Sequence, residues 1–227
     1  MDAEPNTVEA TQIRSISYDQ EEILEWIQRL YCPKGFELDP TYSKGNFYGG
    51  KILSPPLKYD IEPQVEGVVQ ADCRKLPLPD ASVRSIIFDP PFVGASIGSV
   101  EAKIGIIKQR FGFYRKVPIE LWGMYKEALQ EFYRLLYPEG FLIFKCQDTV
   151  EDSKQYLSHI KIINMALNLG FYPKDLFILL AKNRLTSPSQ RIQQHARKYH
   201  CYFLVLQKKQ VYINYSGMSN EYTSAVI

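Results

Sequence analysis

The sequence lacks the signatures of membrane-spanning, disulfide-stabilised and zinc-binding proteins. No apolar stretch approaches the length of about 18 residues that a transmembrane helix needs, and the acidic start shows no signal-peptide pattern. The four cysteines, at positions 32, 73, 146 and 201, have no Cys-x-x-Cys spacing, and the three histidines have no ligand spacing. We therefore expect a cytoplasmic protein without a bound metal or a membrane partner, whose cysteines are buried free thiols.

A second full-sized domain and a dinucleotide fingerprint are also missing. The 227 residues, 45% of them hydrophobic, suffice for one well-buried α/β core and leave no room for two full-sized domains. No Gly-x-Gly-x-x-Gly follows the first apolar run, which argues against a dehydrogenase. We expect one domain over residues 12–210 with inserts at 93–118 and 181–198, a disordered tail at 1–11 and a second tail at 211–227.

The most informative motif is Asp89-Pro90-Pro91-Phe92, which follows the apolar run Val83–Phe88. The nitrogen of an aromatic amine is a poor nucleophile because its lone pair is delocalised into the ring. A carboxylate and a carbonyl that accept its two N–H groups favour the transition state of methyl transfer. Asp89 would supply the carboxylate and Pro90 the carbonyl, which Pro91 holds in place. Phe92 would stack on the base. The motif alone also fits an ordinary strand-to-loop stop.

Three further aspartates stand at the ends of short apolar runs upstream: Asp39, Asp60 and Asp72. A turn that contains the flexible Gly45 follows the first of them and would let the backbone approach a ligand closely. Four strand ends that each carry an acid, all pointing in one direction, match a parallel sheet whose carboxyl edge forms the site.

Hydrophobic periodicity predicts the remaining elements. We expect helices over residues 22–30, 120–137 and 154–169. We expect strands over residues 35–39, 57–61, 68–73, 83–88, 141–146, 175–180 and 199–207.

Over roughly residues 12 to 207 the sequence resembles the class I S-adenosylmethionine-dependent amino-methyltransferases of nucleic acids, which carry an Asp-Pro-Pro-aromatic motif. The resemblance implies a Rossmann-like α/β fold with a seven-stranded, mostly parallel sheet whose last strand is antiparallel. It also implies S-adenosyl-L-methionine as the cofactor. The sequence departs from the usual Asp-Pro-Phe-x-Gly-x-Gly of this family, because Ser43 replaces the first glycine and only Gly45 remains.

The resemblance further assigns roles to the strand-end residues. Asp60 would bind the ribose of the cofactor, Asp72 and Cys73 its adenine, and the motif that begins at Asp89 the target base. The methionine part of the cofactor would be held by Asp39, Pro40, Thr41, Gly45 and Asn46.

Basic residues gather in two segments, Lys103–Lys116 and Lys182–Lys209, and aromatic residues interleave the first. Such a pattern suits phosphate contacts combined with base stacking, although a solvated basic surface would read the same way. Two such segments favour a nucleic-acid partner. The residues that we expect to contact it are Lys108, Arg110, Tyr114, Arg191 and Arg197.

The predicted activity is methyl transfer to an exocyclic base amine of DNA. Adenine N6 is favoured over cytosine N4, because relatives that act on cytosine often begin the motif with serine. Two alternatives stay open: an RNA base amino-methyltransferase, and a non-catalytic subunit that binds nucleic acid for an active partner. Neither insert is large enough for a target-recognition domain, so target choice would come from these loops or from a protein partner.

Overall fold

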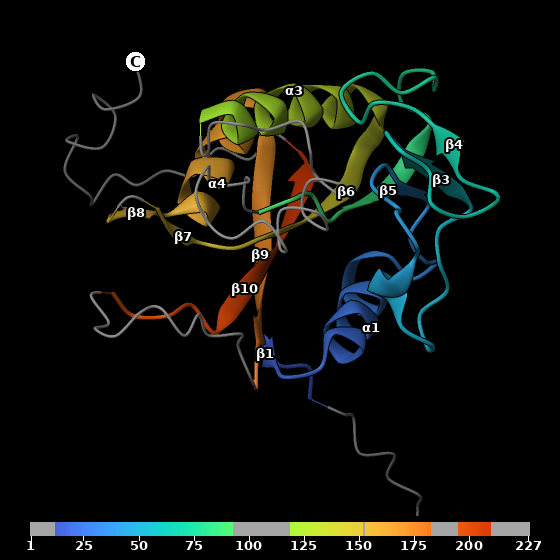
Figure 1. The fold of residues 1–227 in the computed structure, drawn as a ribbon. Helices are drawn as coiled ribbons and strands as arrows, with labels where there is room; N and C mark the ends of the chain where they lie inside the picture. The colour runs from blue at the N-terminus through green and yellow to red at the C-terminus, as the bar shows by residue number, and fades with distance from the viewer. Residues whose placement is uncertain (1–11, 93–118, 152, 183–194, 210–227) are drawn as a thin grey trace, which may run out of the picture.

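An eight-stranded sheet forms the centre of the computed structural model, which describes residues 12–92, 119–151, 153–182 and 195–209 (Figure 1). The strand order is β1-β9-β10-β6-β5-β2-β3-β4. The strands are β1 (Ile16–Ser17), β2 (Leu38–Asp39), β3 (Leu57–Asp60), β4 (Val69–Gln70), β5 (Val83–Phe88), β6 (Leu136–Cys146), β9 (Phe171–Leu180) and β10 (His200–Lys208).

One strand runs against the rest of this sheet. β10 is antiparallel to both of its neighbours, β9 and β6, whereas the other pairings are parallel. The carboxyl ends of β2, β3, β4, β5, β6 and β9 therefore meet at one edge. This arrangement confirms the predicted mostly parallel α/β sheet with an antiparallel last strand.

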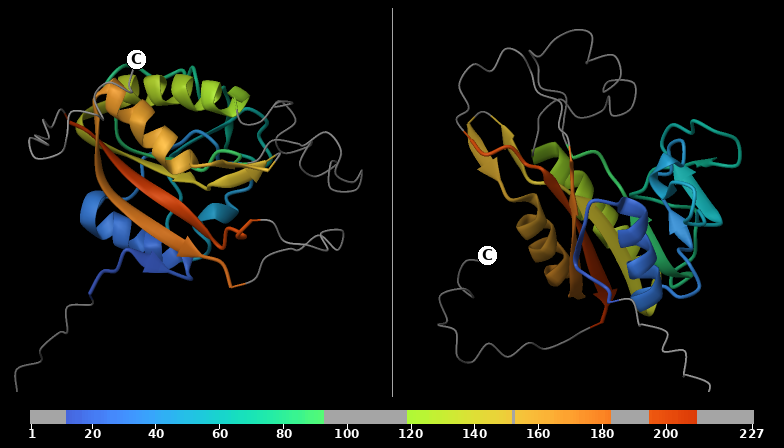
Figure 2. Two further views of the ribbon diagram at one scale, coloured as in Figure 1. Left: turned by 90° about the vertical axis from the view of Figure 1, so that its left-hand side faces the viewer. Right: turned by 90° about the horizontal axis from the view of Figure 1, so that it is seen from below.

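Helices cover both faces of the sheet (Figure 2). α1 (Gln20–Tyr31) lies on one face, and α3 (Ile119–Leu135) and α4 (Ser158–Leu169) lie on the other. A short 3-10 helix, η1 (Asn46–Tyr48), follows β2, and β7 (Thr149–Glu151) pairs with β8 (Lys154–Tyr156) in a separate hairpin. The sheet is thus the middle layer of three.

Apolar periodicity explains why these helices dock where they do. In α1, Ile23 and Ile27 are fully buried and belong to the same cluster as Phe203 of β10. Asp19 is the N-cap of this helix, because its carboxylate accepts the amide N–H of Glu21 at 2.9 Å. On the opposite face, edge-to-face ring pairs fix α3 against the sheet: Phe132 contacts Phe88 of β5 at 4.8 Å between centroids, and Tyr125 contacts Phe144 of β6 at 5.2 Å.

The structure corrects several element boundaries. The expected helix over 154–169 begins only at Ser158, because residues 154–156 pair as β8 with β7. The expected helix over 120–137 ends at Leu135, since Leu136 already pairs with Val83 of β5. The pairing between β5 and β6 shifts in register after Val83: Val83 pairs with Leu136, whereas Ser85 pairs with Phe141. The eighth strand, β1, was not predicted; it is two residues long and adds to the edge at β9.

Several predicted segments lie wholly or partly outside the residues that the structure describes. The predicted tails at 1–11 and 211–227 and the insert at 93–118 lie outside the described residues, as does most of the insert at 181–198. All four cysteines are free thiols, and three of them are buried, whereas Cys73 is half-buried. No helix in the described part of the chain is long and apolar enough to cross a bilayer.

Candidate active site at the carboxyl edge of the sheet

A cavity of about 410 Å³ opens at the carboxyl edge of the sheet. Its walls come from the loop after β2, from the ends of β3, β4 and β5, and from single side chains of α1, α3 and β6. The lining residues predicted from the sequence are Pro40, Thr41, Gly45, Asn46, Asp60, Asp72, Cys73, Asp89 and Pro91. The structure therefore brings most of the predicted site residues together around one cavity.

Contacts at both ends hold the Asp89–Phe92 segment in place. At its start, the Asp89 amide N–H donates to the hydroxyl oxygen of Thr41 at 3.3 Å. Near its end, the hydroxyl of Tyr125 in α3 donates to the carbonyl oxygen of Pro91 at 2.5 Å. Pro90 between them is buried. The segment is thus tied to the loop after β2 and to α3.

Asp39 lies beneath the cavity and does not line it. Its side chain accepts the Thr41 amide N–H at 2.8 Å and the Tyr48 hydroxyl at 2.6 Å, and only 4% of the residue is exposed. Burial raises the pKa of Asp39 to about 7, against the opposing effect of its hydrogen-bond donors, and the nearby Asp89 raises it further. Asp39 therefore shapes the loop from within the protein, and its predicted contact with a cofactor stays a prediction.

Asp60 fixes the same loop from β3. Its two carboxylate oxygens accept the amide N–H groups of Ser43 and Glu62, each at 2.8 Å. Gly45 lies in this loop directly before η1 and adopts a φ of +75°. A Cβ at this position would lie 2.5 Å from the hydroxyl oxygen of Tyr42. Only glycine fits this conformation and this close approach. Each Asp60 oxygen keeps a second lone pair for a ligand that enters the cavity.

Asp72 is held at the far wall by its neighbour Arg74. The guanidinium Nε donates to both carboxylate oxygens of Asp72, at 2.9 and 3.0 Å, and this hydrogen bonding holds the pKa of Asp72 below its usual range. Burial raises the pKa of the neighbouring Cys73 thiol to about 12, so it stays neutral. This wall therefore combines an ionised acid with a neutral thiol.

Sequence reasoning missed two residues at the centre of the cavity, Lys145 of β6 and Gln20 of α1. The ammonium of Lys145 donates to Gln20 Oε1 at 2.9 Å and lies 3.5 Å from Asp89 Oδ1. The Gln20 amide in turn donates to the carbonyl of Phe47 at 2.6 Å. A lysine inside the apolar run 141–146 was the signal for the first residue, while nothing in the sequence pointed to the second.

Acidic groups outnumber basic ones around the cavity. Four carboxylates, those of Asp60, Glu62, Asp72 and Asp89, line it together with the two ammonium groups of Lys44 and Lys145. Burial raises the pKa of Asp89, and the ammonium of Lys145 opposes that rise. The wall thus suits a ligand that carries positive charge and hydrogen-bond donors.

The remaining predicted residues lie elsewhere. Phe92 does not line the cavity, although its ring centroid is 5.8 Å from the Lys145 ammonium. Arg197 is half-buried just before β10 and does not line the cavity either. Four predicted nucleic-acid contacts lie outside the described residues: Lys108, Arg110, Tyr114 and Arg191.

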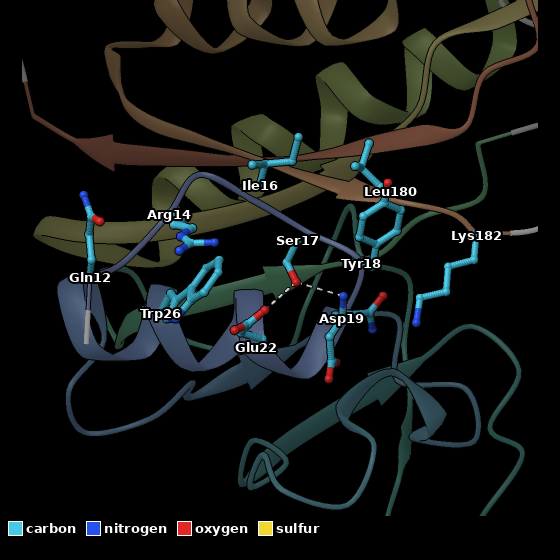
Figure 3. A pocket seen from close by; sticks show the side chains of 11 residues that line it. Gln12, Arg14, Ile16, Ser17, Tyr18, Asp19, Glu22, Trp26, Leu180 and Lys182 are labelled. Carbon is cyan, nitrogen blue, oxygen red and sulfur yellow. Dashed lines mark hydrogen bonds between the residues drawn. The ribbon is translucent and has the colours of Figure 1, made fainter.

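A second, larger groove of about 1150 Å³ runs beside β1 and the start of α1 (Figure 3). Its polar groups are partly engaged with one another, since the Ser17 hydroxyl donates to Glu22 at 2.5 Å and accepts the Asp19 amide N–H at 2.9 Å. The groove contains none of the four strand-end aspartates and shares only Gln20 with the smaller cavity. The smaller cavity is therefore the candidate active site.

The sequence matches no protein-family model and no curated protein sequence. Solved structures are similar in fold. One is a protein from Thermus thermophilus, described provisionally as a DNA modification methylase and complexed with S-adenosyl-L-methionine (TM-score 0.43, 19% identity, 66% of this chain and 55% of that chain). Another is the PvuII cytosine-N4-specific DNA methyltransferase (TM-score 0.46, 14% identity, 63% and 49%). A third, from Galdieria sulphuraria, is described provisionally as a sarcosine dimethylglycine methyltransferase (TM-score 0.51, 12% identity, 84% and 85%).

These likenesses differ in weight. The first two have TM-scores below 0.5, which is too low to support a conclusion about this chain. The chain spans only about half the length of each. The third extends over most of both chains and, at 12% identity, bears on the fold alone. Together with the strand order, it shows that the chain has the Rossmann-like α/β fold of class I methyltransferases.

Proposed function

We propose that the chain transfers a methyl group from S-adenosyl-L-methionine to an exocyclic amine of a nucleic-acid base. The observation that carries this proposal is the Asp89–Phe92 segment at the end of β5, fixed by Thr41 and Tyr125 and opening on the acid-lined cavity. A strand-to-loop stop would explain the prolines, but it would not require a carboxylate held at the mouth of a cavity between strand ends.

The cavity fits the proposed cofactor in size and in charge. A volume of about 410 Å³ lies within the usual range of small-molecule sites. Both the sulfonium and the amino group of S-adenosyl-L-methionine are cationic, and four carboxylates line the wall. Asp60 would accept from the ribose hydroxyls, and Asp72 and Cys73 would face the adenine. The loop from Pro40 to Asn46 would hold the methionine part, with Asp39 fixing that loop from below.

The residues of the motif would position the amine. When bound, the cofactor supplies an electrophilic methyl group. The Asp89 carboxylate would accept one N–H of the target amine and the Pro90 carbonyl the other, which draws the nitrogen toward tetrahedral geometry and takes its lone pair out of conjugation with the ring. Asp89 need not be a strong base, since the amine proton becomes acidic only after the nitrogen has gained the methyl group. Alignment of the reactants and these two acceptors supply most of the rate enhancement.

DNA is the proposed polymer, with adenine N6 as the favoured target. Aspartate at the start of the motif favours adenine over cytosine. In a duplex the base must leave the stack, and Phe92 would then replace its stacking partners. The inserts that hold most of the basic residues begin at the same edge of the sheet as the cavity: insert 93–118 follows Phe92, and insert 181–198 connects β9 to β10.

Mass spectrometry of digested nucleosides tests the proposal. Purified protein and S-adenosyl-L-methionine are incubated with DNA, with RNA and with a protein mixture. Methyladenine in DNA is the expected product, and Asp89→Ala should lose it while it keeps cofactor affinity. Asp80→Ala is a matched control, because this aspartate pairs with Arg134 and does not line the cavity.

The other outcomes are equally informative. Methylated RNA alone would make the RNA alternative correct, and methylcytosine would overturn the base preference. Binding of DNA without methylation of any polymer would favour the non-catalytic subunit. If Asp89→Ala retains full turnover, the role assigned to the motif is wrong.

A further inference from the structure

Lys145 occupies an unusual place for a lysine. It lies on β6, beside β5, and its side chain is only 13% exposed. Lysine is rarely this buried without a specific partner, because its ammonium is strongly hydrated and its stem is flexible. The proposed cofactor contacts and base contacts do not involve it.

Five contacts from four elements fix its ammonium. Three aromatic ring centroids surround it: Phe47 of η1 at 5.0 Å, Phe203 of β10 at 5.5 Å and Phe92 at 5.8 Å. Two polar partners complete the set, namely Gln20 Oε1 of α1 at 2.9 Å and Asp89 Oδ1 at the end of β5 at 3.5 Å. These contacts restrict the lysine to one position next to the carboxylate.

The two oxygens of Asp89 consequently differ. Oδ1 lies against the ammonium, whereas Oδ2 has no hydrogen-bond donor among the residues that the structure describes. The side chain remains 32% exposed and lines the cavity. A target amine would therefore meet an oxygen that is free to accept, on a carboxylate whose orientation is already set.

We propose that Lys145 is a positioning residue that orients Asp89 through Oδ1 and keeps it ionised, leaving Oδ2 to accept the target amine. This inference rests on the proposed function. Lys145 acts through Asp89, so it need not touch the reacting atoms.

Among the titratable groups that the structure describes around Asp89, Lys145 is the one whose charge favours the ionised carboxylate. Asp39 from β2, Tyr48 from η1 and Cys201 from β10 also interact with Asp89, and each is either neutral or negative. Burial raises the pKa of Asp89, and Lys145 lowers it both by its charge and by hydrogen bonding. Removing the ammonium should let the pKa of Asp89 rise further, because burial would then act without the opposing charge.

The test compares Lys145→Met with the wild type and with Lys161→Met. Methionine keeps an unbranched stem of similar length without the charge. Lys161 is a matched control, since its ammonium also lies over a ring, that of Trp122 at 5.8 Å, but it is exposed on the opposite face. Because the Asp89 carboxylate must be ionised, activity falls as the pH drops through its pKa. In Lys145→Met the acid limb of kcat/KM should move to higher pH, whereas Lys161→Met should match the wild type.

A second readout works without any turnover. In protein labelled with ¹³C-aspartate, the carboxyl resonance of Asp89, assigned with Asp89→Asn, should titrate at higher pH in Lys145→Met than in the wild type. Should that variant fail to fold by circular dichroism, Lys145→Gln retains a polar end and should show the same shift. An unchanged Asp89 titration in a folded variant overturns the role of Lys145. A shifted titration without methyl transfer by the wild type would instead overturn the proposed function and leave the lysine–aspartate pair established.

Discussion

At the scale of single residues, the carboxylates around the cavity divide into those that shape the loop and those that remain free for a ligand. Asp39 has its two oxygens bound within the protein, by Thr41 and Tyr48. Asp60 accepts one backbone amide on each oxygen and still lines the cavity. Both acids therefore hold the loop, and Asp60 alone of the two also faces the cavity, although both stand at the ends of neighbouring strands.

Replacing Asp60 should weaken cofactor binding. If its carboxylate accepts from the ribose hydroxyls, Asp60→Ala should cost roughly 1–3 kcal/mol of S-adenosyl-L-methionine binding, as expected for a charge-assisted hydrogen bond. Isothermal titration calorimetry measures this directly. Asp60→Asn retains an acceptor for the Ser43 amide and separates loss of charge from loss of loop order. Wild-type affinity in Asp60→Ala would contradict the ribose role.

Asp39 should make the protein less stable as the pH rises. Its folded pKa of about 7 lies above its ordinary value of 3.8, so between these pH values the folded state binds more protons than the unfolded state. The stability contributed by the protonated group is complete below about pH 4 and is lost as the pH rises through about 7, by up to about 1.4 kcal/mol per pH unit.

Asp39→Asn removes this titration. Urea unfolding measures the free energy of unfolding at pH 5 and at pH 8. Between these pH values that free energy should fall by roughly 2.6 kcal/mol more in the wild type than in the variant. Parallel pH dependence in the two proteins would mean that Asp39 is ionised throughout, with its hydrogen bonds outweighing its burial.

At the scale of elements, the loop between β2 and β3 forms a large part of the cavity wall. Its course depends on Gly45, whose positive φ directs the chain into η1 beneath the ring of Tyr42. Because an added Cβ would meet the Tyr42 ring at 2.5–2.9 Å, this ring would have to move.

Gly45→Ala should therefore lower both stability and cofactor affinity. A non-glycine residue at this φ costs about 1 kcal/mol or more, and the displaced ring adds to that loss. Gly50→Ala is the matched control, because nothing lies within 4 Å of a Cβ at that position. Thermal unfolding with and without S-adenosyl-L-methionine measures both effects. Equal behaviour of the two variants would show that the loop tolerates a side chain at Gly45.

The elements also show what the sequence could and could not predict. The ends of β2 and β5 were predicted correctly and the end of β3 to within one residue, because an acid after an apolar run is a local signal, whereas β4 ends at Gln70, before its predicted end at Cys73. The split of residues 154–169 into β8 and α4 was not predicted, since β8 depends on its pairing with β7. Lys145 was missed for a related reason: its partner Gln20 is 125 residues away in the chain, and only the folded sheet brings the two together.

At the scale of the whole molecule, the carboxyl edge of the sheet holds the candidate active site. β9 is parallel to β6, so Leu180 and the start of β10 lie at the same edge as the cavity. The helices α3 and α4 and most of α1 pack on the faces instead. A polymer substrate would therefore reach the cavity by crossing this edge, where the inserts 93–118 and 181–198 begin.

That placement predicts a salt-dependent affinity for nucleic acid. If Lys108 and Arg191 contact phosphates, each contact releases condensed counterions on binding. Replacing both with alanine should lower the slope of log affinity against log salt by about 1.4 on single strands and about 1.8 on duplex DNA. The loss should be nearly independent of the base sequence, because phosphate contacts position the protein without specifying the sequence. Cofactor affinity should not change.

The control for this prediction is the pair Lys126→Ala and Lys161→Ala. It removes the same charge from the exposed surface of α3 and α4 and should leave the slope unchanged. Fluorescence anisotropy over a salt series measures both variants; equal slopes would mean that the basic segments are only solvated surface, and would favour a protein or a small molecule as the substrate.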